Sequence, residues 1–121
     1  MFVAFAQLPV IDQDRAKQFY MTNLGCEARV DQEYQEGGWR WIELGFPGAD
    51  TTLQFEKRAS EKPSQRPDLV IVTEQVDDTV GSLKQNGVEI ITEPKNAPWN
   101  PRQRFAEFRD SEGNRIVLRT R

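Results

Sequence analysis

The chain repeats itself at a fixed offset, and this repeat constrains its fold more than any other feature. Residues 10–25 align without a gap on residues 72–87, so each position matches the one 62 residues later. The matched positions include Asp12 with Glu74, Leu24 with Asn86 and Gly25 with Gly87, and the same offset pairs Glu27 with Glu89 just beyond these ranges. Self-similarity at a fixed spacing indicates one supersecondary unit that is used twice. We therefore expect two copies of one unit built from a strand, a helix and further strands.

The first half predicts the element order β-α-β-β-β. An apolar run over residues 2–9 predicts a strand, and we expect it to end at Pro9 because proline has no backbone N–H to donate. Asp12 is a suitable N-cap and Gly25 a suitable C-terminal stop for the helix between them. Runs bounded by glycine- and proline-containing turns predict three further strands, at residues 26–32, 39–46 and 51–57.

The second half predicts the same order. A strand at residues 69–72 is followed by a helix that carries Val76, Val80 and Leu83 and stops at Gly87. The remaining strands are expected at residues 88–92, 103–109 and 115–119.

Two segments predict irregular structure. Residues 58–67 are polar and contain two prolines, the composition of a linker. Residues 93–102 contain three prolines around Trp99, and we expect a long loop there, of the kind that is often functional. The expected fold class is α+β, with one domain over residues 1–121. Its module one spans residues 1–57, its linker residues 58–67 and its module two residues 68–121.

Composition excludes several classes of function. The chain of 121 residues has a formal net charge of −3, so we expect no nucleic-acid partner. No apolar run approaches the roughly 20 residues of a membrane span, and the N-terminus does not read as a signal peptide. We therefore predict a soluble, cytoplasmic protein without a membrane partner. Cys26 is the only cysteine and has no histidine partner, so we assign it to packing. The lack of histidine also removes the commonest metal ligand and general base near neutral pH.

Three short motifs occur in order along the chain. They are Asp12 to Arg15 leading to Phe19-Tyr20, then Asn23-Leu24-Gly25, and the turn Arg109-Asp110-Ser111-Glu112-Gly113-Asn114 before a final strand. Together with the duplication, they resemble the vicinal oxygen chelate superfamily, which contains glyoxalase I, extradiol dioxygenases, fosfomycin-modifying enzymes and bleomycin-resistance proteins. The resemblance covers essentially the whole chain and departs at Ser111-Glu112, where the family usually has Pro-Asp. It implies two β-α-β-β-β modules in an open, cupped mixed sheet, with the helices outside and the ligand site inside the cup.

The resemblance also implies where a metal ion would be held. The four ligand positions of the enzymatic branches correspond here to Phe5, Gln54, Asp68 and Val117. Phenylalanine and valine offer no donor atom to a divalent metal. A shift of the first strand by two residues would bring Gln7 onto the same face, but two amides and one carboxylate make a weak site. We therefore expect no functional metal and no cofactor, and we expect these positions to line a binding cavity.

Alternation along the strands predicts which side chains share the cup-facing side. If Gln54 points into the cup, then Leu53 and Phe55 pack under the helix. We expect Ile42 and Leu44 to point into the core from the third strand, so that Trp39, Trp41 and Glu43 point into the cup. The expected ligand-binding residues are Phe5, Gln7, Trp39, Trp41, Glu43, Gln54, Trp99 and Phe105. An aromatic wall with a carboxylate recognises flat or cationic molecules by stacking, cation–π attraction and charge pairing.

These residues favour a metal-free small-molecule-binding protein, similar to the bleomycin-resistance branch, that sequesters an aromatic or cationic ligand in the cup. The alternative is a glyoxalase-like lyase or isomerase with an atypical or absent metal site, in which Glu43 or Glu56 is a candidate base. A third reading is an interaction module with an aromatic patch for a protein partner. The resemblance implies a homodimer, and the sequence leaves open whether modules pair within one chain or between two.

Overall fold

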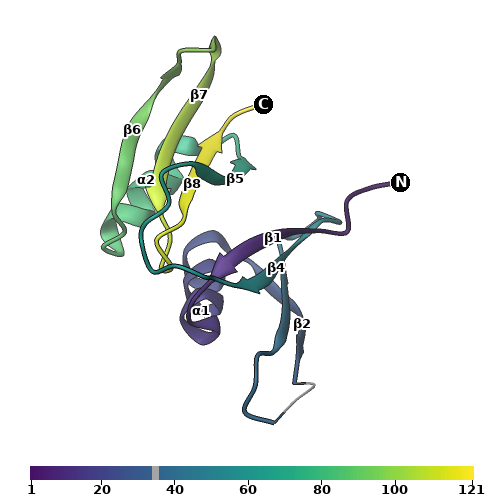
Figure 1. Cartoon of the computed structure of the whole chain (residues 1–121). Coiled ribbons are helices and arrows are strands. Elements are labelled where there is room, and N and C mark those ends of the chain that lie inside the picture. Colours follow the sequence, from purple (N-terminus) through teal and green to yellow (C-terminus); the bar gives the residue numbers. More distant parts are fainter. Residues whose placement is uncertain (34–35) are drawn as a thin grey trace. The chain divides into compact units, whose positions relative to one another are not determined.

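The element order β-α-β-β-β occurs twice in the computed structural model, which describes residues 1–33 and 36–121 (Figure 1). The chain divides into two units, Met1–Glu61 and Lys62–Arg121, and each unit has its own helix and its own four-stranded mixed sheet. The predicted α+β fold class with two β-α-β-β-β modules is confirmed. Among the described residues, no helix is long and apolar enough to cross a membrane.

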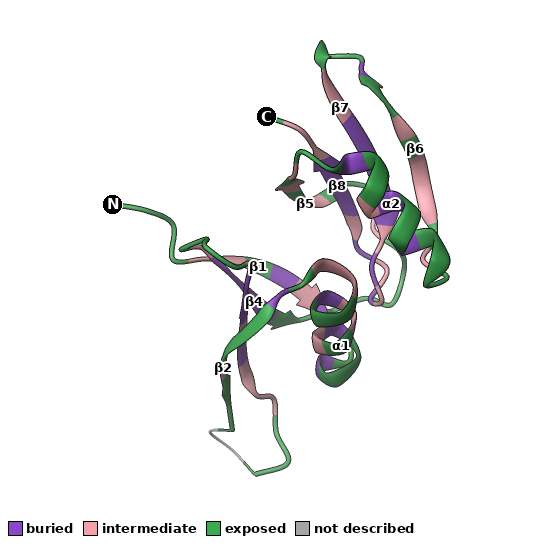
Figure 2. Cartoon of the chain, turned by 180° about the vertical axis from the view of Figure 1, so that it is seen from behind, coloured by how far each residue is buried: buried purple, intermediate pink, exposed green. Residues whose placement is uncertain are grey.

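The first unit consists of β1 (Phe5–Val10), α1 (Gln13–Leu24), β2 (Glu27–Gln32), β3 (Trp41–Gly45) and β4 (Thr52–Lys57). Its strands lie in the order β1-β4-β3-β2, with β1 parallel to β4 and the other neighbours antiparallel. The buried core lies between the sheet and α1 (Figure 2), and its fully buried side chains include Leu8, Ile42, Leu44 and Phe55 from the strands and Ala16 and Tyr20 from the helix.

The ends of α1 follow the sequence signals. The Asp12 side chain accepts a hydrogen bond from the backbone N–H of Arg15 at 3.1 Å, so it caps the first turn. Gly25 has a φ of 70°, a left-handed conformation that glycine adopts without steric cost, and its N–H donates to the carbonyl of Tyr20. Both predicted ends of this helix are confirmed.

The second unit consists of β5 (Pro67–Val72), α2 (Val76–Gln85), β6 (Ile90–Ala97), β7 (Asn100–Arg109) and β8 (Arg115–Arg119). Its strand order, β5-β8-β7-β6, repeats that of the first unit, again with one parallel pair. The three apolar residues predicted for its helix, Val76, Val80 and Leu83, are buried. The helix ends two residues before Gly87, which has a φ of 77°.

The prediction that Pro9 ends the first strand is wrong. β1 continues to Val10, whose carbonyl accepts a hydrogen bond from the N–H of Arg58 at 2.8 Å. β1 is an edge strand that pairs with β4 alone, so the missing N–H of Pro9 does not interrupt hydrogen bonding to a second neighbouring strand.

The predicted long loop at residues 93–102 is also wrong. These residues belong mostly to a hairpin, in which only Pro98 and Trp99 connect β6 to β7. β6 is an edge strand, where proline is tolerated, and its register shifts between Thr92 and Lys95, beside Pro94. The proline content therefore indicates an irregular edge of the sheet and not a loop. The predicted linker is shorter as well, because β5 begins at Pro67.

Candidate functional site

One face of the first unit's sheet carries aromatic and polar side chains, and the other packs on α1. The strand register places Gln7 beside Gln54 and Glu43 beside Gln54, so these three residues form one row across β1, β4 and β3. We call this side of the sheet the aromatic–acid face. Its main side chains are Phe5, Gln7, Trp41, Glu43, Thr52 and Gln54. Trp39, which precedes β3, is attached to the neighbouring strand β4 by a hydrogen bond from its indole to the carbonyl of Phe55.

The carboxylate of Glu43 is fixed in place by two donors. The indole Nε1 of Trp41 donates to Oε2 at 2.8 Å, and the hydroxyl of Thr52 donates to Oε1 at 2.7 Å. Glu43 is half-buried. A negative charge that is partly removed from water attracts a nearby cation or polarised donor more strongly than an exposed one does.

Two aromatic rings meet on the same face. The rings of Phe5 and Trp41 lie edge to face, with centroids 5.8 Å apart and planes at 80°. Phe5 lies on β1 and Trp41 on β3, and β4 runs between these strands. The two rings therefore meet above β4.

Gln54, on β4, is the buried polar residue of this face, with 1% of its surface exposed. Its Nε2 donates to the carbonyl of Phe55 at 2.9 Å, and the same carbonyl accepts from the indole of Trp39 at 3.4 Å. Its Oε1 is buried and has no hydrogen-bond partner in the described part of the chain. Most buried polar atoms have a partner, so this unpaired acceptor is a candidate contact for a ligand or an ordered water.

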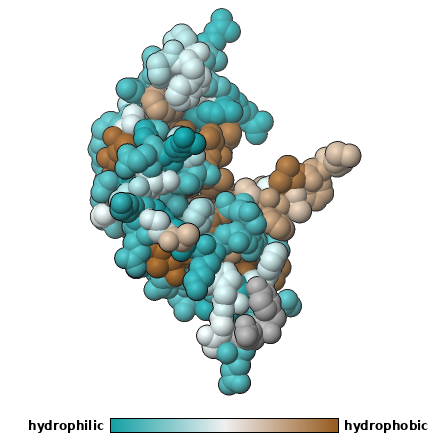
Figure 3. All heavy atoms as spheres, in the orientation of Figure 1, coloured by the Kyte–Doolittle hydropathy of each residue, from teal (hydrophilic) through white to brown (hydrophobic). Residues whose placement is uncertain are grey.

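The rest of the face is more open. Gln7 and the alternative base Glu56 are both exposed. The apolar residues Met1, Phe2 and Val3, which precede β1, are exposed too and form the projecting apolar end in Figure 3.

The second unit has its own aromatic group, at the β6–β7 hairpin. Trp99 is 57% exposed, and its ring centroid lies 4.7 Å from that of Phe105. The ammonium of Lys95 lies 5.7 Å from the centre of the Phe105 ring, within range of a cation–π interaction. Phe105 also packs with Ala97 and Val117 in a buried cluster.

An ion pair lies on the same sheet. The guanidinium of Arg115 donates to both oxygens of Glu107, at 2.8 and 3.1 Å, and the hydroxyl of Thr92 donates to Oε2 at 2.6 Å. Burial alone would raise the pKa of Glu107, but the hydrogen bonds from Arg115 and Thr92 outweigh it and hold that pKa below its usual value. Glu107 is therefore a fixed anion with its own partners.

The residues at the family's metal positions do not form a donor set for a divalent ion. The ring of Phe5 packs on Trp41, and Val117 lies in the apolar cluster of the second unit. Asp68 accepts a hydrogen bond from the backbone N–H of Arg115 at 3.2 Å. The remaining position, Gln54, offers only a neutral amide oxygen. Among the described residues, no group of three or more histidine, cysteine, aspartate or glutamate side chains could hold a metal ion.

Cys26 lies away from this chemistry. Burial raises the pKa of its thiol to about 12, against a smaller opposite effect of Arg29. A thiol that stays protonated is a poor nucleophile.

The structure thus distributes the expected ligand-binding residues over two groups. Six of them, Phe5, Gln7, Trp39, Trp41, Glu43 and Gln54, lie in the first unit, whereas Trp99 and Phe105 contact each other in the second. Sequence reasoning missed the contact of Lys95 with Phe105, because it placed Lys95 in a loop. Strand alternation through residues 95–97 would have placed Lys95 and Ala97 on one face, but the contact with Phe105 depends on the register between β6 and β7.

Comparisons with known proteins agree with this architecture. The family model described as Glyoxalase/Bleomycin resistance protein/Dioxygenase superfamily matches residues 3–118. The chain is 31% identical over 112 residues to the uncharacterized protein YetH of Bacillus subtilis (strain 168). The aligned residues cover 91% of this chain and 90% of YetH.

Solved structures give the same result. TnmS3, an antibiotic binding protein from Streptomyces sp. CB03234, is similar with a TM-score of 0.82 and 33% identity, over 99% of this chain and 95% of that one. A superfamily member from Sphaerobacter thermophilus DSM 20745 is similar with a TM-score of 0.85 and 26% identity, over 100% and 98% of the two chains. Sequence and fold agree over nearly the whole length, and the chain therefore belongs to the glyoxalase/bleomycin resistance protein/dioxygenase superfamily.

Proposed function

We propose that this protein binds and sequesters a planar aromatic or cationic small molecule on the aromatic–acid face of its first unit. The observation that carries the proposal is the carboxylate of Glu43, held by Trp41 and Thr52 beside the Phe5–Trp41 ring pair. A flat ring stacks on such aromatic side chains, and a positive charge or polarised donor on that ring is attracted by the carboxylate. The similarity to TnmS3, an antibiotic binding protein, supports the same class of function.

Binding without bond chemistry fits the state of the acidic groups. Both oxygens of Glu43 already accept hydrogen bonds, so this carboxylate would have to give up a partner to act as a base. Glu56 is exposed, so water solvates the carboxylate of this alternative base. The residues at the family's metal positions lack the donors that a metal-dependent lyase or isomerase needs, so no cofactor is part of this proposal.

The proposal is tested by titrating the protein with 9-aminoacridine, a planar aromatic cation, and following the fluorescence of the dye. We expect saturable binding by the wild type and binding weaker by about tenfold or more in Trp41→Ala, because aromatic anchors dominate the binding energy of such sites. Phe19→Ala is the matched control, since Phe19 is an aromatic residue of α1 that contacts Tyr20. Absence of binding by the wild type, or an equal loss in both variants, would overturn the proposal.

We further propose that two chains form a homodimer. β5 is an edge strand on which Val70 and Val72 are 51% and 46% exposed, and exposed apolar edges are commonly covered by a partner. Light scattering after size exclusion should give twice the chain mass of 14.0 kDa. The double variant Val70→Lys, Val72→Lys should give one chain mass, and a wild-type monomer would contradict the proposal.

A further inference from the structure

The unpaired oxygen of Gln54 has a defined orientation. Its Nε2 donates to the carbonyl of Phe55 at 2.9 Å, and Oε1 is buried without a partner in the described part of the chain. A flipped amide would place Oε1 against the Phe55 carbonyl, two acceptors facing each other. The amide therefore presents an acceptor, and not a donor, to the aromatic–acid face.

Neither neighbour of Gln54 in its row donates a hydrogen bond to its Oε1. Glu43, beside it on β3, is itself an acceptor, and both of its oxygens are engaged by Trp41 and Thr52. Gln7, beside it on β1, has an exposed side chain. This part of the face therefore matches a ligand that brings an N–H or O–H group of its own.

The ring pair above β4 determines how such a ligand reaches Gln54. Phe5 pairs with Thr52, which is the next residue of β4 on the same face as Gln54. The Trp41 ring extends toward Glu43, which pairs with Gln54. The indole of Trp41 is anchored by its hydrogen bond, whereas the Phe5 ring has no polar anchor and belongs to the first residue of an edge strand. The Phe5 ring is therefore the one that can move.

We propose that Gln54 Oε1 determines ligand specificity: it accepts a hydrogen bond from the N–H or O–H group of a planar aromatic ligand that replaces the Phe5 ring against Trp41. The inference rests on the proposed function and adds the chemical feature that the ligand must carry. A site with a buried acceptor discriminates against a ligand of the same shape that lacks the donor, because that ligand leaves the acceptor unpaired.

Carbazole and dibenzofuran test this inference directly. The two molecules are planar, neutral and nearly identical in shape, but only carbazole has a ring N–H. We expect the wild type to bind carbazole about tenfold more tightly than dibenzofuran, measured by fluorescence titration of each probe. In Gln54→Met, which keeps the side-chain length and removes the acceptor, the two affinities should become equal, mainly through weaker binding of carbazole.

Gln18→Met is the matched control, because it removes an exposed amide from α1, outside the aromatic–acid face, and should leave the preference for carbazole unchanged. The thermal unfolding midpoint of Gln54→Met should stay close to that of the wild type, since removal of the unpaired acceptor offsets the lost hydrogen bond from Nε2 to the Phe55 carbonyl, which keeps the Trp39 indole as a donor. Equal wild-type affinity for both probes, or an unchanged preference in Gln54→Met, would overturn the inference and leave the binding function intact. If the wild type binds neither probe nor 9-aminoacridine, the proposed function itself is wrong, and this inference falls with it.

Discussion

Gly45 shows how one small residue makes room for a side chain that holds a turn. Arg29, at an irregularity in the β2–β3 ladder, crosses over Gly45 and donates to the carbonyls of Phe46 and Ala49 at 2.7 and 2.6 Å. A Cβ atom added at Gly45 would lie 2.2 Å from the guanidinium carbon of Arg29. The glycine therefore makes room for the guanidinium of Arg29, and a larger residue here would have to displace this side chain.

Gly45→Ala should lower the free energy of unfolding by about 0.5–1 kcal/mol, because the exposed guanidinium of Arg29 must shift and give up its hydrogen bonds to make room. Gly81→Ala is the matched control: Gly81 lies inside α2, and nothing would lie within 4 Å of its added Cβ. That control should raise stability by about 0.5–1 kcal/mol through better helix propensity. Urea unfolding of both variants measures the effects, and an unchanged stability of Gly45→Ala would contradict the packing argument.

Glu107 gives the protein a pH-dependent contribution to stability. Its folded-state pKa lies below its ordinary value of 4.5, so the stabilisation is fully present above that pH and is lost as the pH falls through the folded value. Glu107→Gln should lower the free energy of unfolding by about 1–2 kcal/mol at neutral pH and have less effect under acid conditions. Urea unfolding of both proteins at pH 7 and at about pH 3 measures this. If the two proteins differed equally in free energy of unfolding at both pH values, the ion pair of Glu107 with Arg115 would not be the cause of the lost stability.

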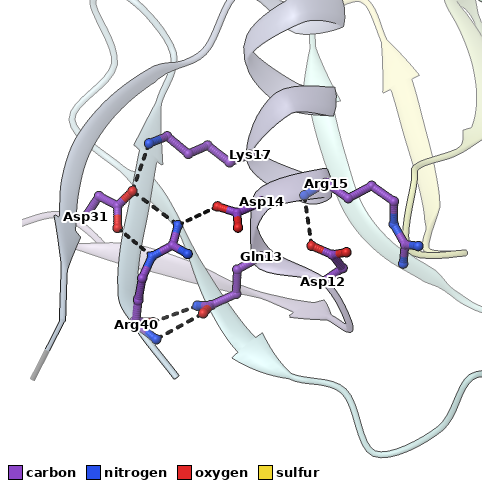
Figure 4. A network of polar contacts seen from close by, with 7 residues as sticks. All are labelled: Asp12, Gln13, Asp14, Arg15, Lys17, Asp31 and Arg40. Atoms are coloured by element: carbon purple, nitrogen blue, oxygen red, sulfur yellow. Dashed lines mark hydrogen bonds and ion pairs between the residues drawn. The ribbon is translucent and has the colours of Figure 1, made fainter. Parts of the chain in front are cut away.

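At the scale of elements, a polar network attaches α1 to the first unit's sheet (Figure 4). The amide of Gln13 donates to the backbone carbonyl of Arg40 at 2.7 Å and accepts from the backbone N–H of Arg40 at 3.0 Å. Arg40 directly precedes β3, and Gln13 satisfies both of its backbone groups as a neighbouring strand would. The Arg40 guanidinium contacts Asp14 and Asp31, and Lys17 also contacts Asp31. Hydrogen bonds from Arg40 and Lys17 hold the pKa of Asp31 below its usual value.

Within this network, the buried amide should matter more than the exposed charge. Gln13→Ala should lower the free energy of unfolding by about 2 kcal/mol, because it leaves two backbone groups of Arg40 without partners. Asp14→Ala, whose side chain is 81% exposed, should cost about 0.5 kcal/mol or less. Chemical denaturation of the two variants gives the comparison, and equal effects would mean that the helix attachment does not depend on the amide.

The elements themselves illustrate what sequence patterns predict well. Asp12 and Gly25 predict the ends of α1 because capping depends on one residue and its nearest neighbours. Pro9 and Pro94 mislead because their effect depends on whether the strand lies inside or at the edge of a sheet. Edge position is a property of strand order, which no local pattern contains.

At the scale of the whole molecule, the two units have separate sheets and separate buried cores. Gln13 and Glu107 lie in different units and share no partner. The double variant Gln13→Ala, Glu107→Gln should therefore lose the sum of the two single losses, to within about 0.5 kcal/mol. Denaturation at neutral pH tests this, and a coupling larger than that would show that the two networks depend on one another.

The sequence by itself determined the duplicated β-α-β-β-β order, the helix ends and the side chains that share one strand face, because repeats, caps and alternation are encoded by residues close together in the chain. Only the tertiary structure decided how those side chains engage one another. The hydrogen bond from Thr52 to Glu43 and the edge-to-face contact of Phe5 with Trp41 join different strands, and the unpaired oxygen of Gln54 is buried on the strand between β1 and β3. Such contacts depend on strand order and register, and these are set by the packing of the whole unit.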